Sequence, residues 1–199
     1  AYHVHGYTNL EKHEQRGPLI ITGGSDIRVT DEAGKSYIEG LAGLWCTSLG
    51  FQEDRLIEAA SAALKKLPYY HGFAHKTADV TIDLAEKLIS IAPVPMSKVL
   101  FANSGSEAND LAIKLIWYYN NALGRPEKKK IISRDRAYHG ITVATGSLTG
   151  LAPIHDDFDL PIDRILHNDC PHFYRGADDG ATEEDFGTRM AENMENLII

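Results

Sequence analysis

The chain has 199 residues, of which 43% are hydrophobic and 24% are charged, and these ordinary globular values exclude disordered and collagen-like proteins. A formal net charge of −8 argues against a nucleic-acid partner, because phosphate binding needs a concentrated basic face. No apolar stretch approaches the roughly 20 residues of a membrane helix and no signal-peptide pattern opens the chain, so we expect a cytoplasmic protein with no membrane partner.

The first 45 residues combine loops with short strands. The apolar segment 18–21 is followed by the segments 26–30 and 36–39, in which apolar residues alternate around a Gly-containing turn. This pattern is typical of antiparallel hairpins. We therefore predict short antiparallel strands in this part of the chain.

Beyond the hairpin region, the apolar residues follow a helical period. This period predicts helices at 56–67, 80–91 and 108–119. Two short apolar runs, at 98–102 and 130–133, predict strands. Strands that alternate with helices of this length need crossover connections, which favour a parallel sheet. The sequence therefore predicts an α/β fold.

The last part of the chain gives weaker signals. Residues 169–185 are rich in Pro, Gly and acidic residues and predict a long surface loop. The chain opens without Met and closes on an apolar run at 195–199 without a terminating Gly or Pro, so we expect a segment of a longer protein. Two cysteines far apart in the sequence, Cys46 and Cys170, agree with a reducing compartment.

The sharpest motif is Asn-Ser-Gly-Ser-Glu-Ala-Asn at 103–109, between a predicted strand and a predicted helix. At such a junction, free N–H groups and the positive end of the helix dipole lie at the sheet edge where α/β proteins bind ligands. Gly105 would allow close approach of an anion, and Ser104 and Ser106 would add hydroxyl donors, so a phosphate-bearing ligand fits. Ser104 to Glu107 is also a capping-box pattern that needs no ligand, and the two interpretations are compatible.

A second motif, at 136–140, follows the strand predicted at 130–133 and contains Tyr138, His139 and Gly140. In a parallel sheet it would lie at the same edge as the first motif. Tyr138 could stack on a planar ligand, with His139 behind or beside it. A surface aromatic turn without a ligand is the alternative.

Aromatic residues also gather in the Gly-flanked segments 43–47 and 69–73, where they could line a specificity pocket or simply belong to the core. His71 and His75 are four residues apart, but without an acidic partner they do not resemble a zinc helix, and we expect a loop and no metal site. The sequence motifs of serine hydrolases, P-loop nucleotide hydrolases and thiol redox proteins do not occur.

With these residues in place, the chain resembles the class III aminotransferases, which are pyridoxal-phosphate enzymes of fold type I. Within that family it is most similar to the ω-transaminases that pass an amino group from an amine or ω-amino acid to pyruvate. The likeness extends over essentially all 199 residues and rests on the motifs at 103–109 and 138–140, with further support from 5–8 and 40–46.

The resemblance implies a fold type I large domain, with a mainly parallel sheet and flanking helices, preceded by a small hairpin region. Residues 1–45 would then belong to the small domain, and 46–199 would form the first portion of the large domain that binds pyridoxal phosphate. Family members are homodimers or dimers of dimers, so we expect the same assembly here.

The resemblance also implies roles for individual residues. Gly105 and Ser106 would bind the cofactor phosphate through backbone and hydroxyl donors, and Ser104 would shape that turn. Tyr138 would lie against the pyridine ring, and His139 would support it.

Four further residues correspond to the family's substrate pocket. Leu44, Trp45 and Tyr7 would line it. Phe73 corresponds to an aromatic residue that reaches the neighbouring subunit's site in related dimers. These positions imply a pocket for the amine or ω-amino acid donor and for pyruvate.

The family's catalytic lysine has no counterpart in this chain. That lysine carries the cofactor and moves the proton between the substrate carbon and the cofactor, and in the family it lies beyond the matching stretch. Lys35, Lys76, Lys98 and Lys114 stand in none of the right contexts, so we assign no catalytic residue and expect these 199 residues alone to be inactive. An aminomutase, a decarboxylase, or a non-catalytic fragment or degenerate relative remain the alternatives.

Overall fold

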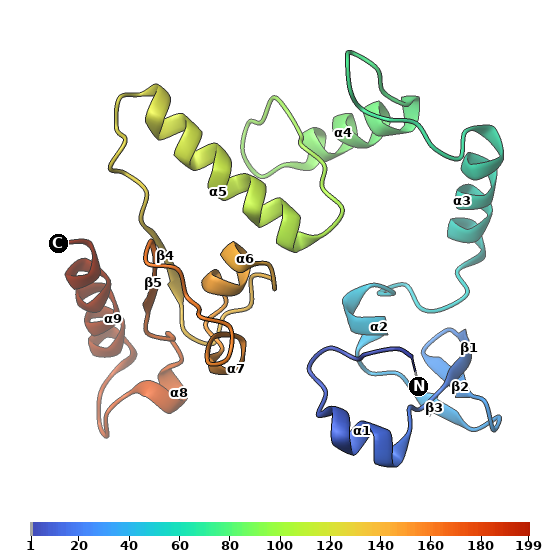
Figure 1. The fold of residues 1–199 in the computed structure, drawn as a ribbon, viewed down its shortest axis with the longest axis horizontal. Helices are drawn as coiled ribbons and strands as arrows, with labels where there is room; N and C mark the ends of the chain where they lie inside the picture. Colours follow the sequence, from blue (N-terminus) through green and yellow to red (C-terminus); the bar gives the residue numbers. More distant parts are fainter. Residues whose placement is uncertain (1) are drawn as a thin grey trace. The chain divides into compact units, whose positions relative to one another are not determined.

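The computed structural model describes residues 2–199, and the chain divides into two compact units, unit 1 (Ala1–Ser90) and unit 2 (Ile91–Ile199) (Figure 1). Each unit is described by itself. The boundary predicted at residue 45 concerns the domains of a larger fold and stays a prediction. The elements that begin in unit 1 are α1 (Leu10–Arg16), β1 (Ile21–Ser25), β2 (Arg28–Asp31), β3 (Ser36–Ile38), α2 (Ala42–Trp45), α3 (Asp54–Lys66) and α4 (Asp79–Ile91).

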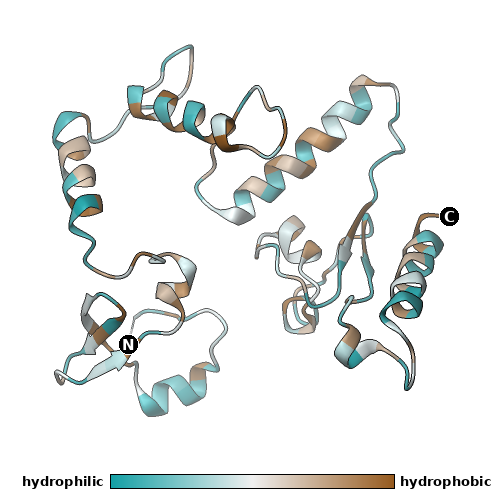
Figure 2. Ribbon diagram, turned by 180° about the vertical axis from the view of Figure 1, so that it is seen from behind, coloured by the Kyte–Doolittle hydropathy of each residue, from teal (hydrophilic) through white to brown (hydrophobic). Residues whose placement is uncertain are grey.

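The strands of unit 1 form the antiparallel sheet that the sequence predicts, in the order β1-β2-β3. Val29, which is buried, pairs with Gly24 on one side and with Tyr37 on the other. The register shifts between Ile21 and Gly23, and such a bulge bends the strand on which it lies. α1 precedes this sheet and is almost entirely hydrophilic (Figure 2).

The carboxylate of Asp31 organises the turn between β2 and β3. It accepts hydrogen bonds from the Tyr37 hydroxyl at 2.7 Å and from the N–H groups of Ala33 and Lys35 at 2.9 Å each. These donors, the Tyr37 hydroxyl first, lower the pKa of Asp31 below its ordinary value of 3.8. The same bond raises the pKa of the Tyr37 hydroxyl.

We expect the hairpin of β2 and β3 to loosen in acid. Because the pKa of Asp31 is lower in the folded hairpin than in the unfolded chain, the stabilisation is present above pH 3.8 and is lost as the pH falls through the folded-state value. The protection factors of the Ala33 and Lys35 amides, which are corrected for the pH dependence of the intrinsic exchange rate, should fall on acidification, and Asp31→Asn should show the lower protection already at pH 7. Glu32→Gln, at an exposed neighbouring carboxylate, should leave both protection factors unchanged; equal loss in the two variants would contradict this role.

α2 is a left-handed turn. Ala42, Gly43, Leu44 and Trp45 have φ angles of 49°, 60°, 61° and 66°. This is the region that only glycine occupies without steric cost. The carboxylate of Glu39 accepts the N–H of Gly43, so a side chain that precedes the turn helps to hold it.

α3 and α4 confirm the two helices predicted from the apolar period, with bounds within a few residues of the prediction. α3 carries Asp54 in its first turn and Lys65 and Lys66 in its last, which complements the helix dipole. No residue of either helix is buried. Their apolar faces are therefore exposed in the part of the chain that the structure describes.

Unit 2 contains a pair of parallel strands with helices around it. β4 and β5 pair in parallel, with Ile131 opposite Ile165 and Ser133 opposite His167, which confirms the predicted direction of the sheet. The elements of unit 2 are α5 (Gly105–Ala122), β4 (Ile131–Arg134), α6 (Val143–Leu148), α7 (Ala152–His155), β5 (Ile165–Asn168), α8 (Phe173–Gly176) and α9 (Glu183–Ile198).

The core of unit 2 lies between α5, α6 and the sheet. Ile113, Leu148 and Ile165 form a buried cluster, and Ile113 and Ile165 are only 4% and 2% exposed. Trp117 packs against this cluster, and its indole N–H donates to the carbonyl of Lys129 at 3.0 Å. These contacts fix α5 relative to β4 and thereby fix the helix end that carries the first motif.

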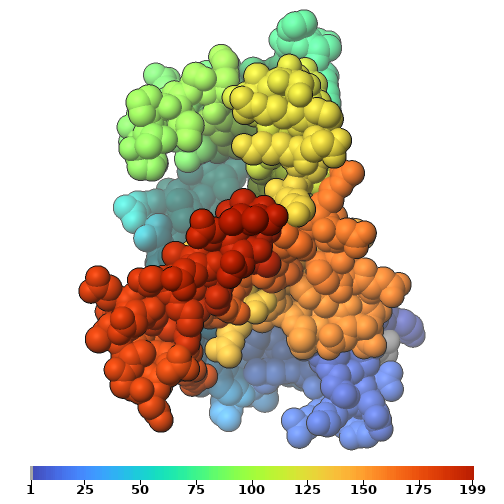
Figure 3. Space-filling view, turned by 90° about the vertical axis from the view of Figure 1, so that its left-hand side faces the viewer, coloured from blue at the N-terminus to red at the C-terminus, as the bar shows by residue number. Residues whose placement is uncertain are grey.

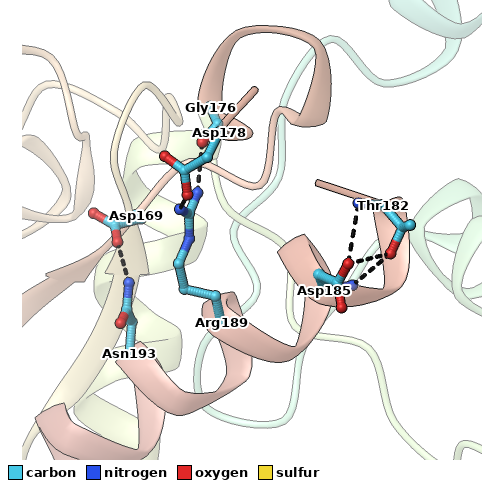
Figure 4. Close-up of polar contacts among 7 residues, drawn as sticks. All are labelled: Asp169, Gly176, Asp178, Thr182, Asp185, Arg189 and Asn193. Carbon is cyan, nitrogen blue, oxygen red and sulfur yellow. Dashed lines mark hydrogen bonds and ion pairs between the residues drawn. The ribbon is translucent and has the colours of Figure 1, made fainter. Parts of the chain in front are cut away.

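α9 packs against β5 and lies on the face that Figure 3 shows, in dark red. Thr182 and Asp185 form a capping box at its start. Arg189 forms an ion pair with Asp178, and the side-chain amide of Asn193 donates to the carboxylate of Asp169, the residue after the end of β5 (Figure 4). The helix is thus tied both to the loop that precedes it and to the carboxyl end of the sheet.

Two sequence predictions were wrong in this unit. Residues 98–102 form no strand, because no other described strand pairs with them and an apolar run needs a hydrogen-bonded neighbour to become one. The predicted loop at 169–185 contains the short helix α8 and runs into α9 at Glu183. Among residues 2–199, we find no helix with both the length and the apolar character needed to cross a membrane.

Candidate functional site

The first motif forms the N-terminus of α5, as its sequence predicts. Ser104 is the N-cap, and its hydroxyl oxygen accepts the N–H of Glu107 at 3.1 Å. The Glu107 carboxylate in turn accepts the N–H of Asn103 at 2.8 Å. The predicted cap is therefore confirmed, with the glutamate reaching back one residue further than in a capping box.

This cap leaves donors free for a ligand. The N–H groups of Gly105 and Ser106 have no hydrogen-bond acceptor among the described residues, and a Cβ added at Gly105 would meet no atom within 4 Å. The Ser106 hydroxyl oxygen accepts the N–H of Ile141 at 3.2 Å, so its own hydrogen can still be donated. Two amides, a hydroxyl and the positive end of an 18-residue helix fit a phosphate group.

The second motif lies directly beside the first. Gly140 is buried and has a φ of 132°, and a Cβ at this position would lie 2.5 Å from the Ser106 hydroxyl oxygen and 2.7 Å from the Thr145 Cβ. Only glycine allows this approach. The structure therefore brings Ser104, Gly105 and Ser106 together with the turn that carries Tyr138 and His139.

Tyr138 and His139 differ in their surroundings. The Tyr138 side chain is 57% exposed, so its ring is available to a planar ligand. His139 is half-buried; its carbonyl accepts the Asn109 amide at 2.8 Å, and its N–H donates to the Thr149 hydroxyl at 2.8 Å. The turn is thus fixed through its backbone, while the tyrosine ring remains accessible.

Sequence reasoning missed two residues of this site. Asn109 belongs to the motif at 103–109, and its place three residues after Ser106, on the same face of α5, is the signal that could have found it. Thr149, the C-cap of α6, follows no recognisable motif, and no signal in the sequence could have placed it beside His139.

The four predicted pocket residues belong to unit 1. Tyr7, Leu44, Trp45 and Phe73 are all exposed. Leu44 and Trp45 lie on the left-handed turn α2, and Phe73 stacks on the ring of His71 with centroids 6.3 Å apart. Their predicted role in substrate binding stays a prediction. The segment around His71 is a loop, as expected.

A comparison with known proteins identifies the family. The model of the family described as "Aminotransferase class-III" matches residues 10–198. The chain is 55% identical over 183 residues to a probable gamma-aminobutyrate transaminase 2, mitochondrial, from Oryza sativa subsp. indica, and 52% identical over 195 residues to gamma-aminobutyrate transaminase 1, mitochondrial, from Oryza sativa subsp. japonica. These matches cover 92% and 98% of this chain but only 37% of each relative.

Solved structures show the same fold. The omega transaminase from Pseudomonas jessenii in complex with PMP is 56% identical, with a TM-score of 0.97 over 99% of this chain and 44% of the other. This similarity confirms the predicted α/β fold of a pyridoxal-phosphate transferase, and the family uses that cofactor. The chain belongs to the class III aminotransferases, and it spans well under half the length of the relatives that it matches.

Proposed function

We propose that the protein containing this chain transfers an amino group from an amine or ω-amino acid to pyruvate in a ping-pong reaction that uses pyridoxal phosphate. The observation that carries the proposal is the junction of the two motifs, where the free N–H groups of Gly105 and Ser106 lie beside the turn that bears Tyr138. When bound, the cofactor supplies an electron sink for the amino-bearing carbon.

The residues present would hold that cofactor at both of its ends. Gly105 and Ser106 would bind its phosphate, with Ser104 fixing the start of the helix through its cap. Tyr138 would cover one face of the ring and exclude water from it, because its side chain is exposed while its backbone is fixed. His139 would support the tyrosine from the half-buried side of the turn.

The substrate side of the proposal concerns unit 1. Tyr7, Leu44, Trp45 and Phe73 are exposed, largely apolar side chains, and we assign them to the pocket for the amino donor and the keto acid. The relatives named gamma-aminobutyrate transaminases support an ω-amino acid as one donor class. Pyruvate as the acceptor is supported by the resemblance to ω-transaminases.

The proton-moving lysine would come from outside these 199 residues. Two lysines of the described residues are engaged elsewhere: Lys35 lies over the Tyr37 ring, and Lys129 donates to the Trp117 carbonyl. The active assembly would be a homodimer or a dimer of dimers. Residues 1–45 would belong to the small domain and 46–199 to the large domain. The proposed location is the cytoplasm; the relatives named above are described as mitochondrial.

The test is the affinity of the intact protein for pyridoxal phosphate after Ser106→Ala. This change removes a hydroxyl donor to the phosphate and also the acceptor of the Ile141 N–H, and losing one such bond costs about 1–3 kcal/mol. We therefore expect the dissociation constant to rise roughly tenfold or more. Ser90→Ala is the control, because it changes an exposed serine whose hydroxyl donates to the Lys87 carbonyl of its own helix. An unchanged affinity of Ser106→Ala for pyridoxal phosphate would contradict the assignment of Ser106 to the phosphate site.

A further inference from the structure

Side chains from outside the Tyr138 turn hold its peptide groups. The His139 carbonyl accepts the Asn109 amide at 2.8 Å, and the His139 N–H donates to the Thr149 hydroxyl oxygen at 2.8 Å. The Thr149 hydroxyl donates in turn to the Gly140 carbonyl at 2.9 Å. Residues 138–140 are part of no helix or strand, so side-chain bonds satisfy these peptide groups. The two residues before them bond through the backbone: the Arg136 N–H donates to the Gly150 carbonyl at 2.7 Å, and the Gly150 N–H donates to the Ala137 carbonyl at 2.9 Å.

Thr149 is suited to this position by its single hydroxyl group. A threonine hydroxyl has one hydrogen and two lone pairs, and here the hydrogen is used on Gly140 while a lone pair receives the N–H of His139. The side chain is fully buried, so water cannot replace either bond. Without the hydroxyl, both peptide groups would lose this partner in a site closed to solvent.

Asn109 connects the same turn to the helix of the first motif. It lies on α5 three residues after Ser106, and the Ser106 hydroxyl accepts the N–H of Ile141 at the far end of the turn. Asn109 and Ser106, on one face of α5, therefore bond to the two ends of this turn, at His139 and at Ile141. The place of Tyr138 relative to the free N–H groups of α5 depends on these contacts.

The geometry points to Thr149 and Asn109 as positioning residues, which hold the Tyr138 ring at a fixed place beside the phosphate donors of α5. This inference rests on the proposed function, because it concerns the same cofactor site. Neither side chain would touch the reacting atoms. Their effect would be on how tightly and in what single orientation the cofactor ring is held.

The experiment compares three variants of the intact protein. Thr149→Val removes the hydroxyl and keeps the shape of the side chain, whereas Thr149→Ser keeps the hydroxyl. Ser147→Ala is the matched control: the Ser147 hydroxyl is also fully buried on α6, donates to the Val143 carbonyl at 2.7 Å and accepts the Ile162 N–H at 3.0 Å, but does not touch the turn. Binding of pyridoxal phosphate is followed by fluorescence quenching and by visible circular dichroism.

We expect Thr149→Val to weaken pyridoxal-phosphate binding roughly tenfold or more and to diminish the circular dichroism of the bound cofactor. Thr149→Ser should restore both values to within roughly twofold of the wild type. Ser147→Ala should lower the melting temperature while the cofactor affinity and the circular dichroism stay as in the wild type. In the cofactor-free protein, the His139 amide should exchange faster in Thr149→Val only.

A second variant keeps the inference testable if Thr149→Val does not fold. Asn109→Asp retains the size of the side chain but places an oxygen opposite the His139 carbonyl, and it should produce the same loss of affinity and of circular dichroism. If the wild type binds the cofactor and both variants bind it as tightly as Ser147→Ala, the inference is overturned and the proposed function stands. If the wild type binds no cofactor, the proposed function itself fails.

Discussion

Gly140→Ala should abolish cofactor binding by the intact protein and lower its stability by about 2–6 kcal/mol. The backbone at this position has a φ of 132°, which costs a non-glycine residue about 1–3 kcal/mol. The added methyl group would also overlap the Ser106 hydroxyl oxygen, 2.5 Å away, and overpacking of this kind costs about 1–3 kcal/mol more. Separating the two motifs relieves the overlap, but it also separates the phosphate donors from Tyr138.

Urea unfolding and the pyridoxal-phosphate dissociation constant measure these two effects independently. Gly187→Ala is the matched control, because Gly187 lies inside α9, where an added Cβ would meet no atom within 4 Å. That change should be neutral or stabilise the protein by up to about 1 kcal/mol. Wild-type affinity in Gly140→Ala would show that the two motifs need not approach as closely as the structure places them.

Ile165→Ala should cost about 2–5 kcal/mol of unfolding free energy. Ile165 is 2% exposed and lies in the core with Ile113 and Leu148, so the missing atoms leave a cavity that the strand pair cannot close. Ile165→Val removes one methylene and should cost only about 0.5–1.5 kcal/mol. Chemical denaturation of the two variants gives this graded series. Equal midpoints for both variants and the wild type would mean that α5 is not held by this core.

The sequence predicts α3, α4 and α5 to within a few residues, whereas it places a strand at 98–102 that does not form, and the reason lies in the range of the interactions. α3, α4 and α5 follow from apolar periods and from ends such as Pro68 and Gly124, which act within a few residues. A strand depends on a partner that is distant in the sequence. Residues 98–102 have the composition of a strand but no described partner, whereas Ile131 meets Ile165 across 33 intervening residues.

The candidate site shows the same difference between local and long-range features. The cap at Ser104 and the open approach at Gly105 are local and follow from the motif itself. The close approach of Gly140 to Ser106 depends on the parallel sheet and on the packing of α5. The sequence predicts only that the two motifs share one edge of the sheet. The hydroxyl of Thr149 could not be predicted, because its partners are backbone groups and backbone groups leave no trace in a sequence.

The left-handed turn α2 has a consequence for Leu44 and Trp45. Each non-glycine residue in this conformation costs about 1–2 kcal/mol, and Gly43 is the one residue of Ala42–Trp45 that avoids this cost. The left-handed backbone sets the directions of the Cα–Cβ bonds of Leu44 and Trp45, and the Glu39 carboxylate, which accepts the N–H of Gly43, helps to hold the turn in this conformation.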